Sequence, residues 1–223
     1  MSLEQIISDE VDKVPFGAGK EPGEQGSVEW LMERVGHCTA SSFYKVLNIK
    51  KNGEYGADHI SYVWDVVVQR LTGNVTSNYT SEAMNHGLAN EPLARMAYES
   101  ATGAMVLETG FKKHPTIPFV GGSPDGVIEP DGGVEIKSPF NPRHHLQCYL
   151  TGMPDEHMAQ IQGLMWIHDA KWWDFVSHCP SMPSELQIYI QRIERDDEYI
   201  SNLEREVQKF LSEVAEIVAK LKG

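Results

Sequence analysis

The chain has 223 residues, of which 41% are hydrophobic and 23% charged, a balance that fits one globular domain of mixed secondary structure with a buried core. No apolar run is long enough for a signal peptide or a membrane span, so the sequence predicts a soluble cytoplasmic protein with no membrane partner. The three scattered cysteines are odd in number and lack C-x-x-C spacing, which argues against a disulfide framework and a zinc ribbon.

The formal net charge is −13, from 32 Asp and Glu residues against 19 Lys and Arg. Phosphate binding depends largely on basic side chains, so this charge alone argues against a nucleic-acid partner. A metal-dependent nuclease, however, gathers carboxylates around cations that invert the local field. The net charge therefore does not exclude an enzyme that acts on DNA. The positions of the basic residues are a better test of DNA binding than their number.

The amino-terminal segment, residues 1–26, carries Gly, Pro and acidic residues without periodicity. This composition predicts a flexible segment rather than a packed element. The single folded domain is therefore expected to span residues 27–223.

The first half of that domain favours helices. Thr72-Gly73 is a typical helix end, and Pro92 marks either a kink or the first position of a new helix. Apolar periodicity predicts helices over residues 28–35, 41–47, 59–71 and about 81–100.

The centre of the chain changes to short β-prone stretches separated by Gly, Pro and Asp, which predicts an antiparallel meander. These stretches cover residues 105–113, 118–122, 126–130 and 133–138. Further along, the pattern predicts a helix over 155–168, strands over 172–178 and 186–193, and a long final helix capped by Asp196 or Asp197. The apolar stripe of this last helix is expected to pack on the sheet, with a coiled-coil partner as the alternative.

The chemistry is concentrated in residues 121–139, GGSPDGVIEPDGGVEIKSP, where an aspartate opens one short strand and Glu-x-Lys lies on the next. Alternation along a strand places Glu135 and Lys137 on one face and turns Ile136 into the core. If the two strands form a hairpin, Asp125 lies beside Glu135, and two carboxylates then face one cation such as Mg²⁺ or Mn²⁺. Such an ion polarises a phosphoryl oxygen and lowers the pKa of a bound water. Lys137 would orient or deprotonate that water with a depressed pKa, or neutralise the transition state.

Taken alone, this motif also fits a turn-rich hairpin with a solvated Glu-Lys face, because Pro-Asp-Gly is a common turn sequence. A zinc cluster is a further alternative, but the spacing matches no common site. Its candidate ligands would be His144, His145, Cys148 and His157.

Further motifs in one order strengthen the nuclease interpretation. They are Trp30 followed by RVGHCTAS at 34–41, Gly-x-x-x-Glu at 87–91, SPDG at 123–126, EIKSPF at 135–140, MAQIQ at 158–162 and IERDDEYI at 193–200. From Trp30 to about Lys209 the chain resembles the lambda exonuclease and YqaJ-like viral recombinase family. The resemblance implies an α/β fold with a PD-(D/E)XK restriction-endonuclease-like core, a mixed central β-sheet flanked by α-helices.

The resemblance also implies a metal site. Asp125, Glu135 and the backbone carbonyl of Ile136 would hold one ion, and Glu91 would complete a site for two ions, Mg²⁺ with Mn²⁺ as a substitute.

Other residues would act on the DNA itself. Together with the catalytic carboxylates Asp125 and Glu135, Lys137 and Gln160 would contact the attacking water and the scissile phosphate. A pocket for a terminal 5′-phosphate would include Arg34, Thr39, Ser41, Ser123 and Arg143. Met84 would fall where an apolar wedge divides the duplex, although acidic Glu82 stands where the family has a basic residue.

The implied activity is hydrolysis of linear double-stranded DNA from 5′ to 3′, which releases 5′-mononucleotides and leaves a 3′ overhang. The resemblance further implies a homotrimeric ring around DNA, a single-strand annealing protein as partner, and a phage or prophage origin in a bacterial cytoplasm. Two other functions stay open, a PD-(D/E)XK endonuclease and a non-catalytic DNA-end-binding scaffold. An iron–sulfur nuclease needs four cysteine ligands, and the chain has three cysteines.

Overall fold

The computed structural model describes residues 25–76 and 82–223. The expected flexible segment therefore lies almost wholly outside the described residues. Within the described part, no helix is both long and apolar enough to cross a membrane.

The helical first half forms largely as predicted. Helix α2 covers Val28–Arg34, the 3-10 turn η1 (Ala40–Ser42) leads into α3 (Phe43–Val46), and α4 covers Ala57–Thr72. Helix α4 ends at Gly73, whose left-handed φ of 70° favours glycine. Helix α5 runs through Glu82–Thr102 with Pro92 inside it, so Pro92 does not begin a separate helix.

Two sheets replace the predicted meander. In the smaller sheet, β3 (Val120–Gly122) lies between β1 (Cys38–Thr39), to which it is parallel, and β2 (Lys112–Lys113), to which it is antiparallel. Strand β3 therefore pairs with a distant segment and not with β4, because the chain between them turns from one sheet to the other. Residues 105–111 form no strand, and only Leu107 bridges Val127.

The larger sheet is mixed, with the order β4-β5-β6-β7. Strands β4 (Gly126–Ile128) and β5 (Gly132–Lys137) form the expected hairpin. Strand β5 is parallel to β6 (Trp172–His178), which is antiparallel to β7 (Ile188–Glu194).

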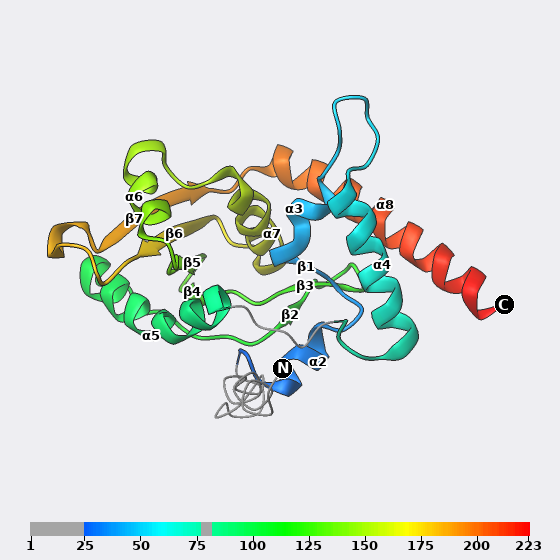
Figure 1. Cartoon of the computed structure of the whole chain (residues 1–223), viewed down its shortest axis with the longest axis horizontal. Coiled ribbons are helices and arrows are strands. Elements are labelled where there is room, and N and C mark those ends of the chain that lie inside the picture. The colour runs from blue at the N-terminus through cyan, green and yellow to red at the C-terminus, as the bar shows by residue number, and fades with distance from the viewer. Residues whose placement is uncertain (1–24, 77–81) are drawn as a thin grey trace, which may run out of the picture.

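Helices cover both faces of this sheet (Figure 1). Val134, Ile136 and Val176 belong to the apolar cluster that includes Ala94 and Tyr98 of α5. On the opposite face, Trp173 and Phe175 join the main core with α7, which covers Met158–His168. This alternation confirms that Ile136 points into the core while its neighbours point the other way.

Two other helices complete the fold. Helix α6 (Pro142–Thr151), which the sequence did not predict, begins with the Asn141 side chain accepting a hydrogen bond from the Arg143 backbone. Helix α8 (Asp197–Lys222) is capped by Asp196, as expected. Its apolar stripe packs on α3, α4 and α7 rather than on the sheet, which corrects the predicted packing and gives the stripe a partner within the chain.

Candidate active site

The candidate site begins where the β4–β5 hairpin opens. Asp125 lies one residue beyond the Gly126–Val134 pair, and its Oδ2 accepts a 2.6 Å hydrogen bond from the Ile136 backbone N–H. Asp125 and Glu135 are both buried, with exposed fractions of 8% and 1%. The hairpin therefore brings these two carboxylates together, as the sequence predicted.

Glu135 has polar partners on one side only. Its Oε1 accepts hydrogen bonds from Lys137 Nζ at 2.5 Å and from Gln160 Nε2 of α7 at 2.6 Å. Its Oε2 is buried and has no hydrogen-bond partner among the described residues. A buried carboxylate oxygen without a donor is costly, and a bound cation would satisfy it.

Glu91 of α5 joins the same electrostatic cluster. Burial and the nearby Asp125 raise the pKa of Glu91 to about 7. Burial and Asp125 likewise raise the pKa of Glu135 to about 8, with a further contribution from Glu91. A site in which Asp125 disfavours the ionisation of both Glu91 and Glu135 suits a divalent cation, whose charge would relieve the repulsion.

The described residues nevertheless contain no group of three or more His, Cys, Asp or Glu side chains arranged to hold a metal ion. The set expected from the resemblance needs only two carboxylates and the Ile136 carbonyl for the first ion. His145 of the alternative zinc group already uses both ring nitrogens, with Ser177 Oγ at 2.8 Å and the Leu186 carbonyl at 2.7 Å.

Lys137 differs from one expectation. Burial disfavours its ammonium, but the attraction of Glu135 and then of Asp125 outweighs this, so the pKa of Lys137 is raised rather than depressed. The predicted low pKa is therefore wrong for the metal-free chain. A protonated Lys137 donates hydrogen bonds and supplies positive charge.

Arg95 was missed by the sequence analysis. It donates to Glu91 at 2.9 Å, one helical turn away, and also pairs with Glu108. The i, i+4 spacing of Glu91 and Arg95 on a helix was the signal that could have revealed it.

A second cluster of polar residues surrounds Arg34. The Arg34 guanidinium donates to Ser123 Oγ and to Ser41 Oγ, both at 3.1 Å, and Ser41 Oγ lies 3.4 Å from Thr39 Oγ1. Trp30 is another residue that the predictions did not place in the site. Its ring centroid lies 4.3 Å from Arg34 Cζ, and its indole N–H donates a hydrogen bond to Ser123 Oγ at 2.8 Å.

Arg34 has no carboxylate partner within the described ranges, and burial lowers its pKa. A half-satisfied, desolvated guanidinium between hydroxyls is suited to an anion such as phosphate. Four of the five residues predicted for this pocket are thus together. Arg143 is exposed on α6, and its side chain forms no hydrogen bond or ion pair in the described part of the chain. The side chain of Met84 lies outside the described residues, so its predicted wedge role stays a prediction.

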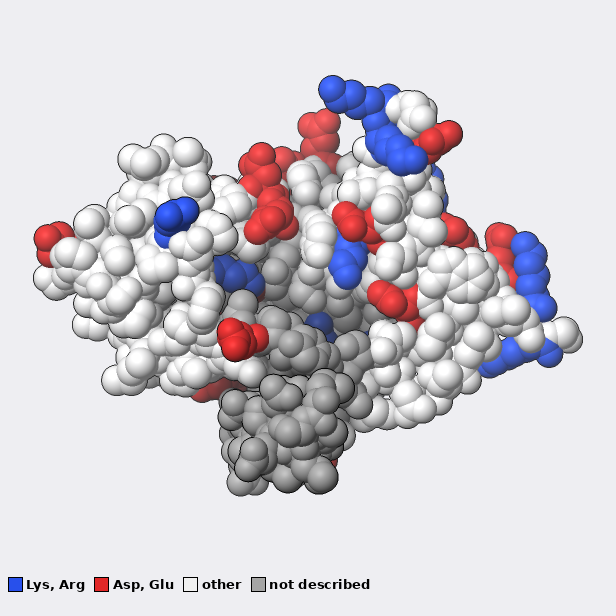
Figure 2. Space-filling view, viewed as in Figure 1, with Lys and Arg blue, Asp and Glu red and all other residues white. Residues whose placement is uncertain are grey.

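The local arrangement also bears on the acidic net charge. On the face shown in Figure 2, basic and acidic side chains are interspersed around a central hollow instead of forming one basic patch. Any binding of a polyanion here would depend on individual cations such as Arg34 and on bound metal ions.

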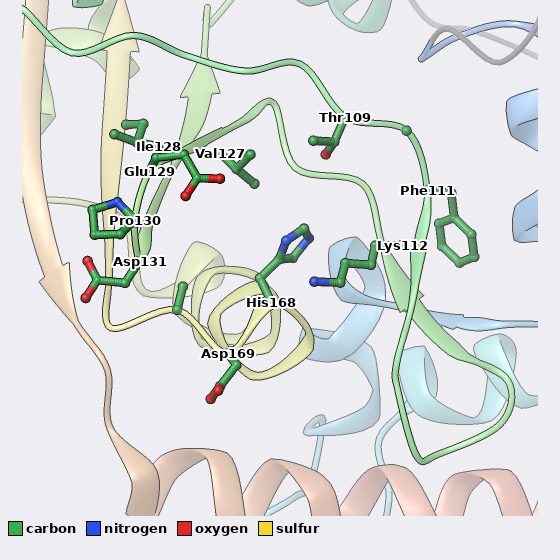
Figure 3. Close-up of a pocket in the computed structure, with 13 residues that line it drawn as sticks. Thr109, Phe111, Lys112, Val127, Ile128, Glu129, Pro130, Asp131, His168 and Asp169 are labelled. Carbon is green, nitrogen blue, oxygen red and sulfur yellow. The ribbon is translucent and has the colours of Figure 1, made fainter.

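A separate cavity of about 460 Å³ lies at the turn of the β4–β5 hairpin, beyond the end of α7 (Figure 3). Lys112 and His168 point toward each other inside it. None of the predicted site residues lines this cavity, so it is distinct from the carboxylate cluster.

Comparison with known proteins supports this description. A model of the YqaJ-like viral recombinase domain matches residues 29–171, more than half of the chain. A search of curated proteins found no significant match.

Solved structures give a closer likeness. The alkaline exonuclease of Laribacter hongkongensis is 38% identical, with a TM-score of 0.80 over 87% of this chain and 95% of that chain. The complex of the same exonuclease with dAMP has a TM-score of 0.81 at the same identity and coverage. A phage-related exonuclease from Haemophilus somnus 129PT, 15% identical, covers 83% of this chain and 96% of its own, with a TM-score of 0.69, and shows likeness of fold.

The mixed sheet between helices, with Asp125 and Glu-x-Lys at the open end of a hairpin, is a fold of the PD-(D/E)XK type, as expected. The family match and the 38% identity over nearly the whole domain agree with the resemblance found in the sequence. The chain belongs to the YqaJ-like viral recombinase family.

Proposed function

We propose that this protein is a divalent-metal-dependent exonuclease that degrades one strand of linear duplex DNA from its 5′ end towards its 3′ end. It would release 5′-mononucleotides and leave a 3′ single-stranded overhang. The observation that carries the proposal is Arg34, a half-buried cation without a carboxylate partner in the described chain, hydrogen-bonded to Ser123 two residues from Asp125. An anion pocket beside paired carboxylates fits a terminal phosphate next to a hydrolytic site.

The residues present fit a hard cation. Asp125 and Glu135, with the Ile136 carbonyl, would hold one Mg²⁺ or Mn²⁺ ion, and Glu91 would contribute to a second. The unpaired Oε2 of Glu135 and the raised pKa values of Glu91 and Glu135 support this assignment. When bound, the ions would supply Lewis-acid activation of the scissile phosphate and of water.

The side chains around the carboxylates have separate roles in this proposal. The Ile136 N–H fixes the Asp125 carboxylate, and Arg95 fixes Glu91. Lys137, which keeps its proton, donates hydrogen bonds to the phosphate and neutralises developing negative charge instead of serving as the base. Gln160 holds the Glu135 carboxylate from α7 and offers its amide to the water or the phosphate.

The proposal extends to a homotrimer around DNA. Helix α4 exposes an apolar stripe with helical spacing, which supports burial against another copy of the chain. Its residues are Ile60, Trp64, Val68 and Leu71, each between 39% and 52% exposed. Light scattering on the purified protein would give the mass, and a monomer would contradict this part of the proposal. A single-strand annealing protein as partner, and a phage or prophage gene expressed in a bacterial cytoplasm, complete the biological setting that we propose.

The test is digestion of a linear duplex that carries one 5′-phosphorylated, end-labelled strand, with Mg²⁺ or with EDTA. A closed circular duplex and the Asp125→Ala variant are the controls. We expect Mg²⁺-dependent release of mononucleotides from the phosphorylated strand, no cleavage of the circle and no activity in the variant. Cleavage of the closed circle would instead indicate an endonuclease, and end binding without cleavage would indicate a scaffold.

A further inference from the structure

An exposed aromatic ring stands at the edge of the candidate active site. Phe140 follows Lys137 by three residues, a backbone reach of at most about 10 Å. Its side chain is 60% exposed, although most large apolar residues of the larger sheet are buried. An exposed Phe beside a polar catalytic cluster contributes little to folding, so its position calls for another explanation.

The ring of Phe140 has one aromatic neighbour in the described residues. The His86 ring of α5 meets it in a perpendicular arrangement, with centroids 5.5 Å apart and an interplanar angle of 90°. His86 is itself held by Asn90, whose amide donates to the His86 carbonyl at 2.8 Å. Asn90 directly precedes Glu91, so the brace is built on the helix that also carries a candidate metal ligand. A perpendicular contact orients an aromatic ring and covers at most one of its faces, so a face remains for stacking.

The position of Phe140 relative to the phosphate pocket indicates what it would stack on. The Arg34 pocket uses Ser123, which directly follows β3 of the smaller sheet, whereas Phe140 follows β5 of the larger sheet. The two carboxylates connect these ends along the chain, because Asp125 follows Ser123 by two residues and Glu135 precedes Phe140 by five. A strand whose terminal phosphate is bound at Arg34 and whose first phosphodiester lies at the carboxylates would therefore place its second nucleotide on the Phe140 side.

We infer that Phe140, braced by His86, is a positioning residue that stacks on the base of the second nucleotide, immediately 3′ of the scissile bond. This inference rests on the proposed exonuclease function. Stacking would hold the strand so that its first phosphodiester remains at the carboxylates, and it would act on every sequence because each base has a π face. Loss of one base–aromatic stack lowers binding or rate by about 5-fold to 150-fold.

The experiment measures single-turnover release of the first nucleotide from 5′-phosphorylated duplexes in Mg²⁺. The substrates carry a normal base throughout, an abasic residue at position 1, or an abasic residue at position 2. The wild type is compared with Phe140→Ala, with Phe140→Trp as the conservative variant, and with Leu150→Ala. Leu150 is a matched control because it is an exposed apolar residue, 86% exposed, on the adjacent helix α6.

We expect Phe140→Ala to lower the rate about tenfold on the normal duplex, and Phe140→Trp and Leu150→Ala to retain the wild-type rate. The abasic residue at position 2 should slow the wild type to the rate of Phe140→Ala and have no further effect on that variant. The abasic residue at position 1 should leave the tenfold difference between the two proteins intact.

Two results of the comparison among the three substrates would overturn the inference. An equal loss for Phe140→Ala on all three substrates would show a structural role, and coupling at position 1 would assign the ring to the terminal nucleotide. The wild-type arm reports separately on the proposed function: failure of the wild type to degrade the normal duplex would overturn that function and the inference together. If Phe140→Ala degrades the normal duplex at the wild-type rate, the inference alone would be overturned.

Discussion

Glu135→Gln is expected to stabilise the metal-free protein while it abolishes metal binding and hydrolysis. The substitution keeps the shape of the side chain and an oxygen that accepts from Lys137 and Gln160. It removes a buried carboxyl group whose ionisation is disfavoured by burial and by Asp125. Residues that make a site functional often destabilise the fold, and this one has an identifiable electrostatic cause.

The magnitude follows from the pKa. Glu135 has a pKa of about 8 in the folded chain, against an ordinary value of 4.5. The folded protein therefore keeps a proton that the unfolded chain releases, and its stability falls as the pH rises from about 4.5 to about 8. At pH 7 this linkage amounts to about 3 kcal/mol, from which about 1 kcal/mol is subtracted for the buried amide N–H₂ without a partner. We therefore expect a net gain of about 2 kcal/mol for Glu135→Gln.

The assay is urea unfolding of both proteins in EDTA at pH 7.5 and pH 5, followed by the same measurement in Mg²⁺. The advantage of the variant should shrink to less than about 1 kcal/mol at pH 5, because this pH lies close to the ordinary pKa of 4.5, at which the unfolded chain also binds the proton. Mg²⁺ should stabilise the wild type alone, because binding to the folded state raises stability by mass action. A variant that is less stable than the wild type at pH 7.5 in EDTA, or that is still stabilised by Mg²⁺, would refute this reasoning.

Three further predictions concern other parts of the structure. Arg34→Ala should slow digestion of 5′-phosphorylated ends about 10-fold to 100-fold and leave the digestion rate of 5′-hydroxyl ends unchanged. Arg34→Lys should not restore the rate, because an ammonium lacks the guanidinium fork. Equal losses on both kinds of end would contradict a phosphate role. Asp174→Ala should lower the free energy of unfolding in urea by about 3 kcal/mol, because the buried Asp174 accepts hydrogen bonds from Tyr98 at 2.7 Å and from Arg192 at 2.9 and 3.0 Å. A loss below about 1 kcal/mol would mean that water takes the place of the Asp174 carboxylate. Burial and Lys112 lower the pKa of His168 to about 4. The free energy of unfolding should therefore fall by about 1–2 kcal/mol from pH 7 to pH 5, because the unfolded chain takes up the proton, and His168→Gln should remove that part of the pH dependence. An unchanged pH dependence in the variant would show that other groups cause it.

The β4–β5 hairpin was predictable because its determinants are local. The twofold alternation of a strand fixes Glu135 and Lys137 on one face, and a short turn brings Asp125 beside them. The pairing of β3 with β1 was not predictable. Thr39 and Gly121 are far apart in the sequence and pair only in the folded protein, and both strands are too short to show an apolar periodicity. Helix α6 is short, with ten residues, and its Asn141-Pro142 start was the signal that could have revealed it.

The site residues outside the hairpin divide in the same way. Arg34, Ser41 and Gln160 are ordinary polar residues in the sequence, and only the joint resemblance to a family singled them out. The pair of Arg95 with Glu91 is predictable, because the two residues stand four apart on one helix. Arg143 was expected in the phosphate pocket, but its place at the start of α6 leaves its side chain exposed.

The arrangement of charges in the candidate site would let an acidic chain act on DNA. Around the cluster, Arg95 and Lys137 offset two of the charges of Glu91, Asp125 and Glu135, and Arg95 is shared with Glu108. Once Glu91 and Glu135 have lost their protons, above pH values of about 7 and 8, an excess of negative charge lies at the point where the scissile phosphate would be, and it repels phosphate until cations bind. Arg34, by contrast, keeps its positive charge uncompensated by any carboxylate in the described residues. If this division is functional, end binding in EDTA should require Arg34 and a 5′-phosphate, whereas added Mg²⁺ should strengthen binding through Asp125 and Glu135 even in Arg34→Ala. Binding in EDTA that ignores both the 5′-phosphate and Arg34 would mean that another surface attracts the DNA.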